Sequence, residues 1–142
     1  MRVLLDSSAL AKRYIAEPGW PQVRALLARA DELLLSILAY PEVIAALSRR
    51  RREGRIGDEQ YEHAKRRATS DLNDATIVGL DAEVMQRTVL CLEREALRAS
   101  DAIHIASAIE AGVDRFVSAD RRQCEAARAT GLTVEEIPSE DP

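Results

Sequence analysis

The sequence is poor in cysteine and contains no long apolar run. Cys91 and Cys124 are its two cysteines, and neither has a cysteine or histidine partner at the spacing of metal ligands. We expect both to be buried free thiols in a reducing compartment. No apolar run approaches the roughly 20 residues that a membrane-spanning helix needs, and residues 1–6 lack the extended apolar core of a signal peptide. The sequence therefore predicts a soluble, cytoplasmic protein without a membrane segment.

Aromatic residues are few, and neither sign of charge dominates. Aromatic side chains make up 4% of the sequence, which argues against a protein that stacks a run of exposed bases. The 24 acidic and 20 basic residues give a net charge of −4, so bulk charge does not indicate nucleic-acid binding. The arginines are nevertheless gathered at residues 49–52 and in the pairs 66–67 and 121–122. We therefore expect local basic surfaces on an acidic protein.

Short apolar runs alternate with helical patterns along the chain. We expect strands at residues 2–5, 33–37, 114–117 and 132–137, with 76–80 as either a short edge strand or an extended link. Helices are expected at residues 7–15, 20–30, 41–52, 59–71, 81–92, 100–110 and 120–129, with Asp58, Asp81 and Ser100 as N-caps. This order predicts an α/β fold with a mostly parallel central sheet of four to five strands and helices on both faces. One domain at 1–138 and a short flexible C-terminal tail at 139–142 are expected.

Four widely separated acidic residues stand where an apolar run gives way to a predicted helix: Asp6, Glu42, Asp101 and Asp120. In an open parallel sheet, strand ends and the following helices meet along one edge, so we expect the four carboxylates to gather there. Two carboxylates roughly 4 Å apart repel each other by about 4 kcal/mol at an effective dielectric constant near 20. A divalent cation is the simplest compensation, and oxygen-only ligands favour Mg²⁺ or Mn²⁺ over Zn²⁺.

Each acid also has a purely structural explanation. Aspartate is a favoured N-cap, and a negative charge in the first turn stabilises a helix by about 0.3–1 kcal/mol. Asp101 and Asp120 fit this explanation when taken alone, and Glu42 is ordinary in a first turn. Asp6 fits it less well, because Ser7 or Ser8 could have capped the helix instead.

In this order, the four acids resemble the motifs of the PIN-domain ribonucleases, and the resemblance covers nearly the whole chain. Residues 6–10, 42–49, 101–106 and 117–120 carry it. The short single-domain length is similar to the VapC toxins of toxin–antitoxin pairs. The resemblance implies a three-layer PIN-like domain and a metal-dependent endoribonuclease, which hydrolyses RNA phosphodiester bonds to leave a 5′-phosphate and a 3′-hydroxyl.

The resemblance also implies a catalytic, metal-binding pocket for Mg²⁺ or Mn²⁺, formed by Asp6, Glu42, Asp101 and Asp120. Asp6 and Asp101 are expected to be direct ligands, whereas Glu42 and Asp120 would hold the metal, its water or a second cation. Ser118 and Ser8 are expected to support the pocket through hydrogen bonds.

Further positions near the motifs leave alternatives open. The family often carries one more acid after the fourth motif, but Arg121 and Arg122 follow Asp120 here, and Glu125 is the nearest substitute. This leaves the occupancy of a second metal site open. His104, three residues after Asp101 on the same helix face, is either a general acid or, more commonly, a neighbour of the core.

Arg49 and Arg50 follow directly from the helix that carries Glu42. They are expected either to guide substrate phosphates at the rim of the pocket or to form a solvated helix end, where cations meet the negative end of the dipole. Recognition of RNA by shape and backbone fits the low aromatic content.

The resemblance implies three partners: a structured RNA such as tRNA or ribosomal RNA, a VapB-like antitoxin and a second copy of the chain. The apolar surfaces around Leu10, Tyr14 and Trp20 belong either to the core or, as the resemblance implies, to a groove that receives the antitoxin. The alternative function is a PIN-like RNA-binding or scaffold protein without catalysis. A phosphotransferase of the haloacid-dehalogenase type is disfavoured because Ser8 stands where a second aspartate is needed. A receiver-type signalling domain is disfavoured because neither Lys12 nor Lys65 follows a late strand.

Overall fold

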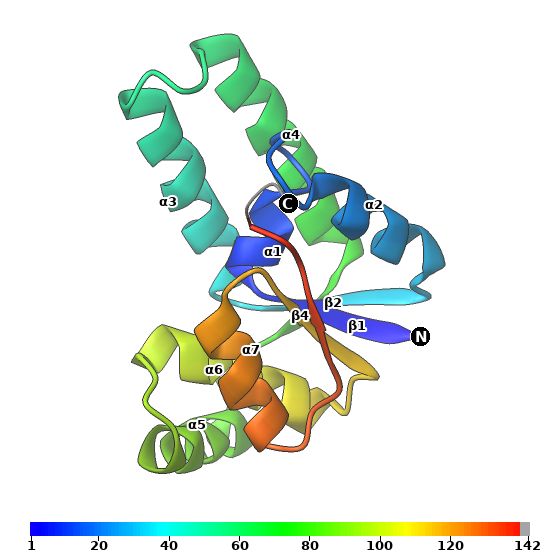
Figure 1. Ribbon diagram of the computed structural model, residues 1–142, viewed down its shortest axis with the longest axis vertical. Helices are drawn as coiled ribbons and strands as arrows, with labels where there is room; N and C mark the ends of the chain where they lie inside the picture. The colour runs from blue at the N-terminus through cyan, green and yellow to red at the C-terminus, as the bar shows by residue number, and fades with distance from the viewer. Residues whose placement is uncertain (140–142) are drawn as a thin grey trace.

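Five parallel strands form the centre of the computed structural model, which describes residues 1–139 (Figure 1). The strand order is β3-β2-β1-β4-β5. The bounds are Arg2–Leu5 for β1, Glu32–Ser36 for β2, Thr76–Val78 for β3, Arg115–Ser118 for β4 and Val134–Glu136 for β5. Val3, Leu4 and Leu5 have no exposed surface, because helices cover both faces of the central strands. The mostly parallel sheet predicted from the sequence is confirmed.

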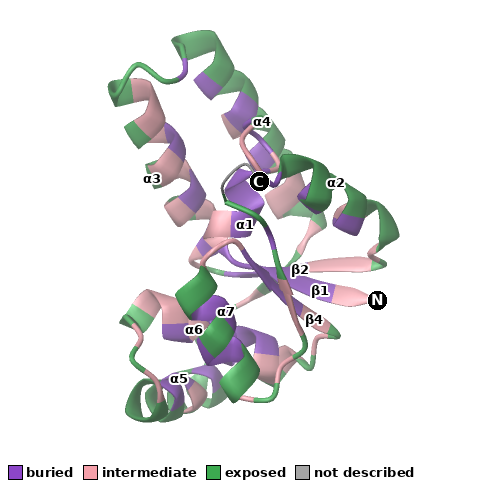
Figure 2. Ribbon diagram, viewed as in Figure 1, coloured by how far each residue is buried: buried purple, intermediate pink, exposed green. Residues whose placement is uncertain are grey.

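The helices form one layer on each side of the sheet. The bounds are Ser7–Ala11 for α1, Trp20–Arg29 for α2, Ala39–Arg52 for α3, Asp58–Asp74 for α4, Ala82–Arg94 for α5, Ala99–Ala111 for α6 and Arg121–Ala129 for α7. Helices α1 to α4 lie above the sheet in Figure 1, and α5 to α7 lie below it. Each layer has its own apolar cluster against the sheet, and the buried residues line the inward sides of the helices (Figure 2).

The connections make the boundary between β1 and β4 the switch point of the sheet. From β1 the chain proceeds outward to β2 and β3 through the first helix layer, and it then returns to β4 and β5 through the second. Strands β1 and β4 are therefore neighbours that lead into opposite layers, with Leu5 paired to Val117. Ligands of open α/β sheets bind outside the carboxyl ends of strands at such a point.

Helix α1 is shorter than the predicted segment 7–15. It ends at Ala11, and the chain continues in tight turns, with hydrogen bonds from Arg13 N to Leu10 O and from Tyr14 N to Ala11 O. The side chains of Arg13 and Tyr14 both bind the carboxylate of Asp71 on α4. This contact with a residue far along the sequence sets the direction of the chain after α1. The apolar spacing of residues 7–15 could not predict it.

Two of the three predicted N-caps are wrong. Gly57 rather than Asp58 precedes α4, and Arg98 rather than Ser100 precedes α6, in both cases without a side-chain capping bond. Asp58 and Ser100 instead lie inside the first turns of their helices. Asp81 is confirmed, because its carboxylate accepts a hydrogen bond of 2.9 Å from Val84 N.

The uncertain segment after α4 forms the edge strand β3, which pairs with β2 alone. Cys91 and Cys124 are buried free thiols, as predicted, and burial raises the pKa of both. No helix within residues 1–139 is both long and apolar enough to cross a bilayer. Of the expected tail, residues 140–142 lie outside the described residues.

Candidate acidic active site at the sheet edge

Asp6 and Ser118 stand at the carboxyl ends of the two central strands. Asp6 follows β1 and is the N-cap of α1, and Ser118 is the last residue of β4. Both are buried, with relative exposures of 1% and 0%. The parallel pairing of β1 with β4 brings together residues that are 112 positions apart in the sequence.

The Asp6 carboxylate is held by three donors. Its Oδ1 accepts hydrogen bonds from Ser8 Oγ at 2.7 Å and from Ala9 N at 2.9 Å, and its Oδ2 accepts one from Ser118 Oγ at 2.5 Å. Ser8 Oγ in turn accepts a hydrogen bond from Ala119 N at 3.0 Å. Both serines predicted to support the pocket therefore contact Asp6 directly.

Burial raises the pKa of Asp6, although Ser118, Ala9, His104 and Ser8 all act to lower it. The hydrogen bonds thus compensate only part of the loss of solvation when the ionised carboxylate is buried. A carboxylate offers about four lone-pair sites, and the three donors leave one of them available. A cation at that site would supply the missing stabilisation.

A chain of polar contacts connects Asp6 to Asp120 and Asp101. Ser118 Oγ accepts a hydrogen bond from Asp120 N at 3.0 Å. The Asp120 carboxylate caps α7 by accepting from the backbone N–H groups of Arg122 and Gln123. The buried Gln123 side chain then donates from Nε2 to the carbonyl oxygen of Asp101 at 3.1 Å. This network fixes the starts of α6 and α7 beside the end of β4.

Sequence reasoning missed Gln123. Its position three residues after the N-cap Asp120 resembles a capping box, in which glutamine is one of the preferred residues. That signal would have marked the residue as part of a helix start. The bond to Asp101, however, depends on how α6 and α7 lie together.

Asp101 and Asp120 line a cavity of about 290 Å³. Arg98, Arg122 and Gln123 line the same cavity, and Arg98 Nε lies 3.4 Å from Asp101 Oδ2. Asp6 and Glu42 do not belong to the lining. Two acids and two arginines in one cavity can bind a cation and a phosphate side by side. The two arginines were not predicted as site residues.

Glu42 contacts α6 from the other helix layer. It lies in the first turn of α3, and its Oε1 is 2.5 Å from Nε2 of His104 on α6. Burial acts to raise the pKa of Glu42, but the hydrogen bond and electrostatic interaction with His104, with smaller contributions from Ser7 and Arg98, outweigh it and lower the pKa. His104 itself is 1% exposed. Its burial agrees with the predicted alternative of a core neighbour. Its contact with the Glu42 carboxylate also connects it to one of the four predicted acids.

The basic residues predicted for the rim have different surroundings. Arg50 forms an ion pair with Glu17, with 2.6 Å between Nε and Oε1, and it donates to Ala46 O. Arg49 is exposed in the last turn of α3. Glu125 is exposed on α7, and no hydrogen bond or ion pair within residues 1–139 involves its side chain.

The donor set suits a hard divalent cation. Within residues 1–139, no group of three or more Asp, Glu, His or Cys side chains is placed as a ready-made metal cage. Mg²⁺ is nevertheless usually bound through one or two carboxylates together with waters and substrate phosphates. Asp101 and Asp120, which line one cavity, offer the two carboxylates of that smaller requirement.

Comparison with known proteins gives one consistent family. The model of the PIN domain matches residues 3–129. Ribonuclease VapC45 of Mycobacterium tuberculosis is 36% identical over 134 residues, which cover 93% of either chain.

Solved structures share the fold at much lower sequence identity. VapC20 of Mycobacterium tuberculosis, described as a toxin that cleaves the sarcin-ricin loop, has a TM-score of 0.68 at 18% identity and covers 92% of this chain and 96% of its own. The DNA-bound VapBC of Salmonella typhimurium has a TM-score of 0.69 at 15% identity, with 96% and 98% covered. These likenesses concern the fold alone.

Proposed function

Because this chain belongs to the PIN-domain family, we propose that it is an endoribonuclease, the toxin of a VapBC-type toxin–antitoxin pair, and that it depends on Mg²⁺ or Mn²⁺. The family and the ribonuclease VapC relatives support the enzyme class. The observation that carries the proposal is the polar chain from Asp6 through Ser118 and Asp120 to Asp101 at the switch point of the sheet. Asp6 caps α1, but an uncharged side chain could serve as the cap, so capping alone does not explain a buried carboxylate.

Each acid has a task in this proposal. Asp6 and Asp101 would bind the metal directly, and Asp120, which lines the same cavity as Asp101, would do so as well. Glu42 would hold a second cation or take up the proton of the attacking water. The bound cation would place positive charge beside the phosphate and lower the pKa of the attacking water. Ser118 and Ser8 would keep the Asp6 carboxylate in one orientation while the substrate binds.

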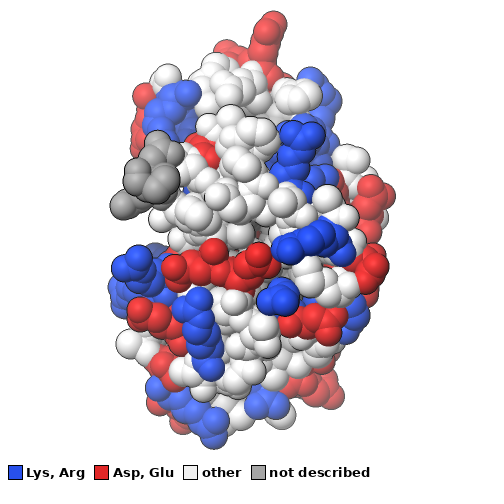
Figure 3. All heavy atoms as spheres, turned by 45° about the vertical axis from the view of Figure 1, so that its right-hand side comes forward, with Lys and Arg blue, Asp and Glu red and all other residues white. Residues whose placement is uncertain are grey.

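The RNA backbone would be held by arginines close to the acids. Arg98 and Arg122 line the cavity of Asp101 and Asp120, whereas Arg49 lies at the far end of α3. Figure 3 shows basic and acidic side chains interspersed on one face rather than gathered in one basic surface. Contacts at a few phosphates of a structured RNA, such as tRNA or ribosomal RNA, fit this distribution better than a long basic track.

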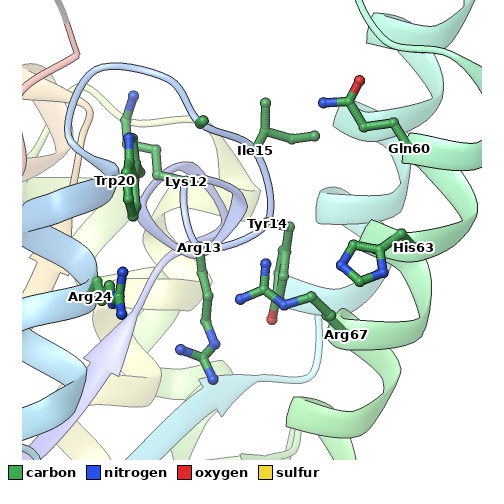
Figure 4. Close-up of a pocket in the computed structure, with 10 residues that line it drawn as sticks. Lys12, Arg13, Tyr14, Ile15, Trp20, Arg24, Gln60, His63 and Arg67 are labelled. Carbon is green, nitrogen blue, oxygen red and sulfur yellow. The ribbon is translucent and has the colours of Figure 1, made fainter.

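We also propose that a VapB-like antitoxin occupies the pocket between α2 and α4. This pocket has a volume of about 510 Å³. Lys12, Arg13, Trp20 and Arg24 lie on one side of it, and Gln60, His63 and Arg67 of α4 lie on the other (Figure 4). An antitoxin segment with acidic and apolar side chains would complement it. Trp20 is the single tryptophan of the chain, so its fluorescence should change when a VapB-like antitoxin is added.

A second copy of the chain would cover the outer face of α5. Met85, Val89 and Leu92 follow one another at helical spacing and are 49%, 53% and 37% exposed. An apolar stripe of this kind commonly marks a protein interface. The proposed homodimer predicts that Val89→Glu yields monomers in analytical ultracentrifugation, whereas the wild-type chain sediments as a dimer.

The direct test compares the wild type with Asp6→Asn and Asp101→Asn on total RNA in Mg²⁺, Mn²⁺ or EDTA. We expect cleavage by the wild type with metal only, and no cleavage by either variant although both remain folded. An intact RNA pool under every metal condition would contradict the enzyme proposal. It would favour the non-catalytic RNA-binding or scaffold protein, which RNA retention on a filter would then detect.

A further inference from the structure

His104 and Glu42 form a contact that bridges the two helix layers. Glu42 lies on α3 above the sheet, and His104 lies on α6 below it (Figure 1). Their side chains are in contact, with 2.5 Å between Nε2 and Oε1. The imidazole is 1% exposed, whereas the Glu42 side chain is 34% exposed. A fully buried group therefore contacts a partly exposed one.

The surroundings of His104 define which nitrogen donates. Nδ1 is buried and has no hydrogen-bond partner within residues 1–139. A proton on Nδ1 would leave a buried donor unsatisfied, whereas a proton on Nε2 is accepted by the Glu42 carboxylate. Nε2–H is thus the donor to Oε1. This direction of the bond orients Glu42 and leaves the rest of its carboxylate for other ligands.

We infer that His104 is a positioning residue, which holds Glu42 so that its carboxylate can contribute to a metal site. The inference rests on the proposed metal-dependent function. Carboxylates that bind metals are themselves commonly oriented by hydrogen bonds, and losing such a partner typically weakens metal affinity or activity 10- to 100-fold.

Helix α6 strengthens this arrangement because it carries two groups of the site. Asp101 lies three residues before His104, so both side chains lie on the same face of the helix. Asp101 faces the shared cavity directly, and His104 supports the acid that comes from the opposite layer. Helix α6 therefore fixes the distance between its own acid and Glu42.

The test is a Mn²⁺ titration of the antitoxin-free protein, with free Mn²⁺ counted by electron paramagnetic resonance. His104→Leu removes the donor and should weaken Mn²⁺ binding about 10- to 100-fold. His104→Gln offers an amide N–H at a similar reach and should retain most of the affinity. Ser107→Ala is the matched control, because Ser107 is a buried polar residue of α6 whose side chain, within residues 1–139, hydrogen-bonds only to Ile103 O of its own helix.

A merely structural role predicts a different pattern. The melting temperature in EDTA would then fall while the Mn²⁺ affinity of the folded protein stayed unchanged, and that result would overturn the inference. In a Glu42→Gln background, His104→Leu should cause no further loss of Mn²⁺ affinity. If it causes the same loss there, His104 does not act through Glu42.

A second pair of variants serves if His104→Leu fails to fold. His104→Gln can reach Glu42 and should retain Mn²⁺ affinity, whereas His104→Asn is too short to reach it and should lose affinity.

Activity separates this inference from the proposed function. In RNA cleavage, His104→Leu should need more Mg²⁺ for half-maximal rate while the KM for RNA stays near the wild-type value. If the wild type binds Mn²⁺ but cuts no RNA, the proposed function fails, and the Mn²⁺ titration still decides the role of His104. If the wild type binds no Mn²⁺, both are overturned.

Discussion

Ser118 Oγ donates a hydrogen bond of 2.5 Å to Asp6 Oδ2 across the ends of the two central strands. The same hydroxyl accepts a hydrogen bond from Asp120 N. One buried side chain thus joins the acid of the first motif to that of the fourth. Its position explains why a serine follows the apolar residues Phe116 and Val117 at the end of β4.

Ser118→Ala should destabilise the protein and lower its activity together. The buried Asp6 loses a donor and Asp120 N loses an acceptor, so the free energy of unfolding should fall by about 1–3 kcal/mol. Urea unfolding measures this change, and RNA cleavage should fall as Asp6 loses its fixed orientation. Ser118→Thr keeps the hydroxyl and serves as the control. Equal stability of the alanine variant and the wild type would contradict the role given to this bond.

Much of the site follows from the sequence because its signals are local. Asp6 and Asp120 each end a short apolar run, and strand ends of a parallel sheet gather at one edge. Asp120 is also the N-cap of α7, so its structural explanation is correct and does not compete with a functional one. Ser118 was predicted as a supporting residue, and it contacts Asp6.

The rest could not be predicted, because it depends on contacts between distant elements. The end of α1 is directed by Arg13 and Tyr14, which bind Asp71 more than 50 residues away. Arg50 was expected either at the rim or at a solvated helix end, and it is bound to Glu17. Arg98 and Arg122 line the cavity of Asp101 because of how α6 packs beside α7. No pattern within one helix contains this information.

The pH dependence of stability should identify Asp6 as a buried acid whose loss of solvation is only partly compensated. Burial raises the pKa of Asp6 above its ordinary value of 3.8. The folded state therefore retains a proton that the unfolded chain has already released. The stabilisation is complete below the ordinary pKa and is lost as the pH rises through the folded-state pKa.

Asp6→Asn removes this titration. In EDTA, the variant should equal the wild type at acidic pH and exceed it at neutral pH, by about 1.4 kcal/mol for each pKa unit of the shift. Urea unfolding between pH 4 and 8 measures the difference. Glu42→Gln should behave in the opposite way, because the pKa of Glu42 is lowered and its stabilisation is lost as the pH falls. A lower stability of Asp6→Asn at every pH would contradict this account.

Gly19 lets the chain end pack against the turn before α2. It has a φ of 99°, and an added Cβ would lie 2.2 Å from Pro138 O and 2.7 Å from Ile137 Cγ2. Gly19→Ala should therefore lower the free energy of unfolding by about 1–3 kcal/mol, from backbone strain and from displacement of that segment. Gly54→Ala, at a φ of 73° with open space around it, carries the strain without the clash. The two variants should differ in urea midpoint, and equal midpoints would show that the contact with Ile137 and Pro138 contributes nothing.

Arg122 and Arg49 offer two different places for an RNA phosphate, and the salt dependence of binding decides between them. Arg122 lines the cavity of Asp101 and Asp120, whereas Arg49 is exposed in the last turn of α3. A residue that binds a phosphate releases a counterion, so its loss should reduce the slope of log K against log salt by about 1. RNA binding by the inactive Asp101→Asn protein, measured over a range of salt concentrations, isolates this effect from cleavage. We expect Arg122→Ala to reduce the slope and Arg49→Ala to leave it unchanged. The reverse result would place the RNA backbone along α3 and remove Arg122 from the substrate site.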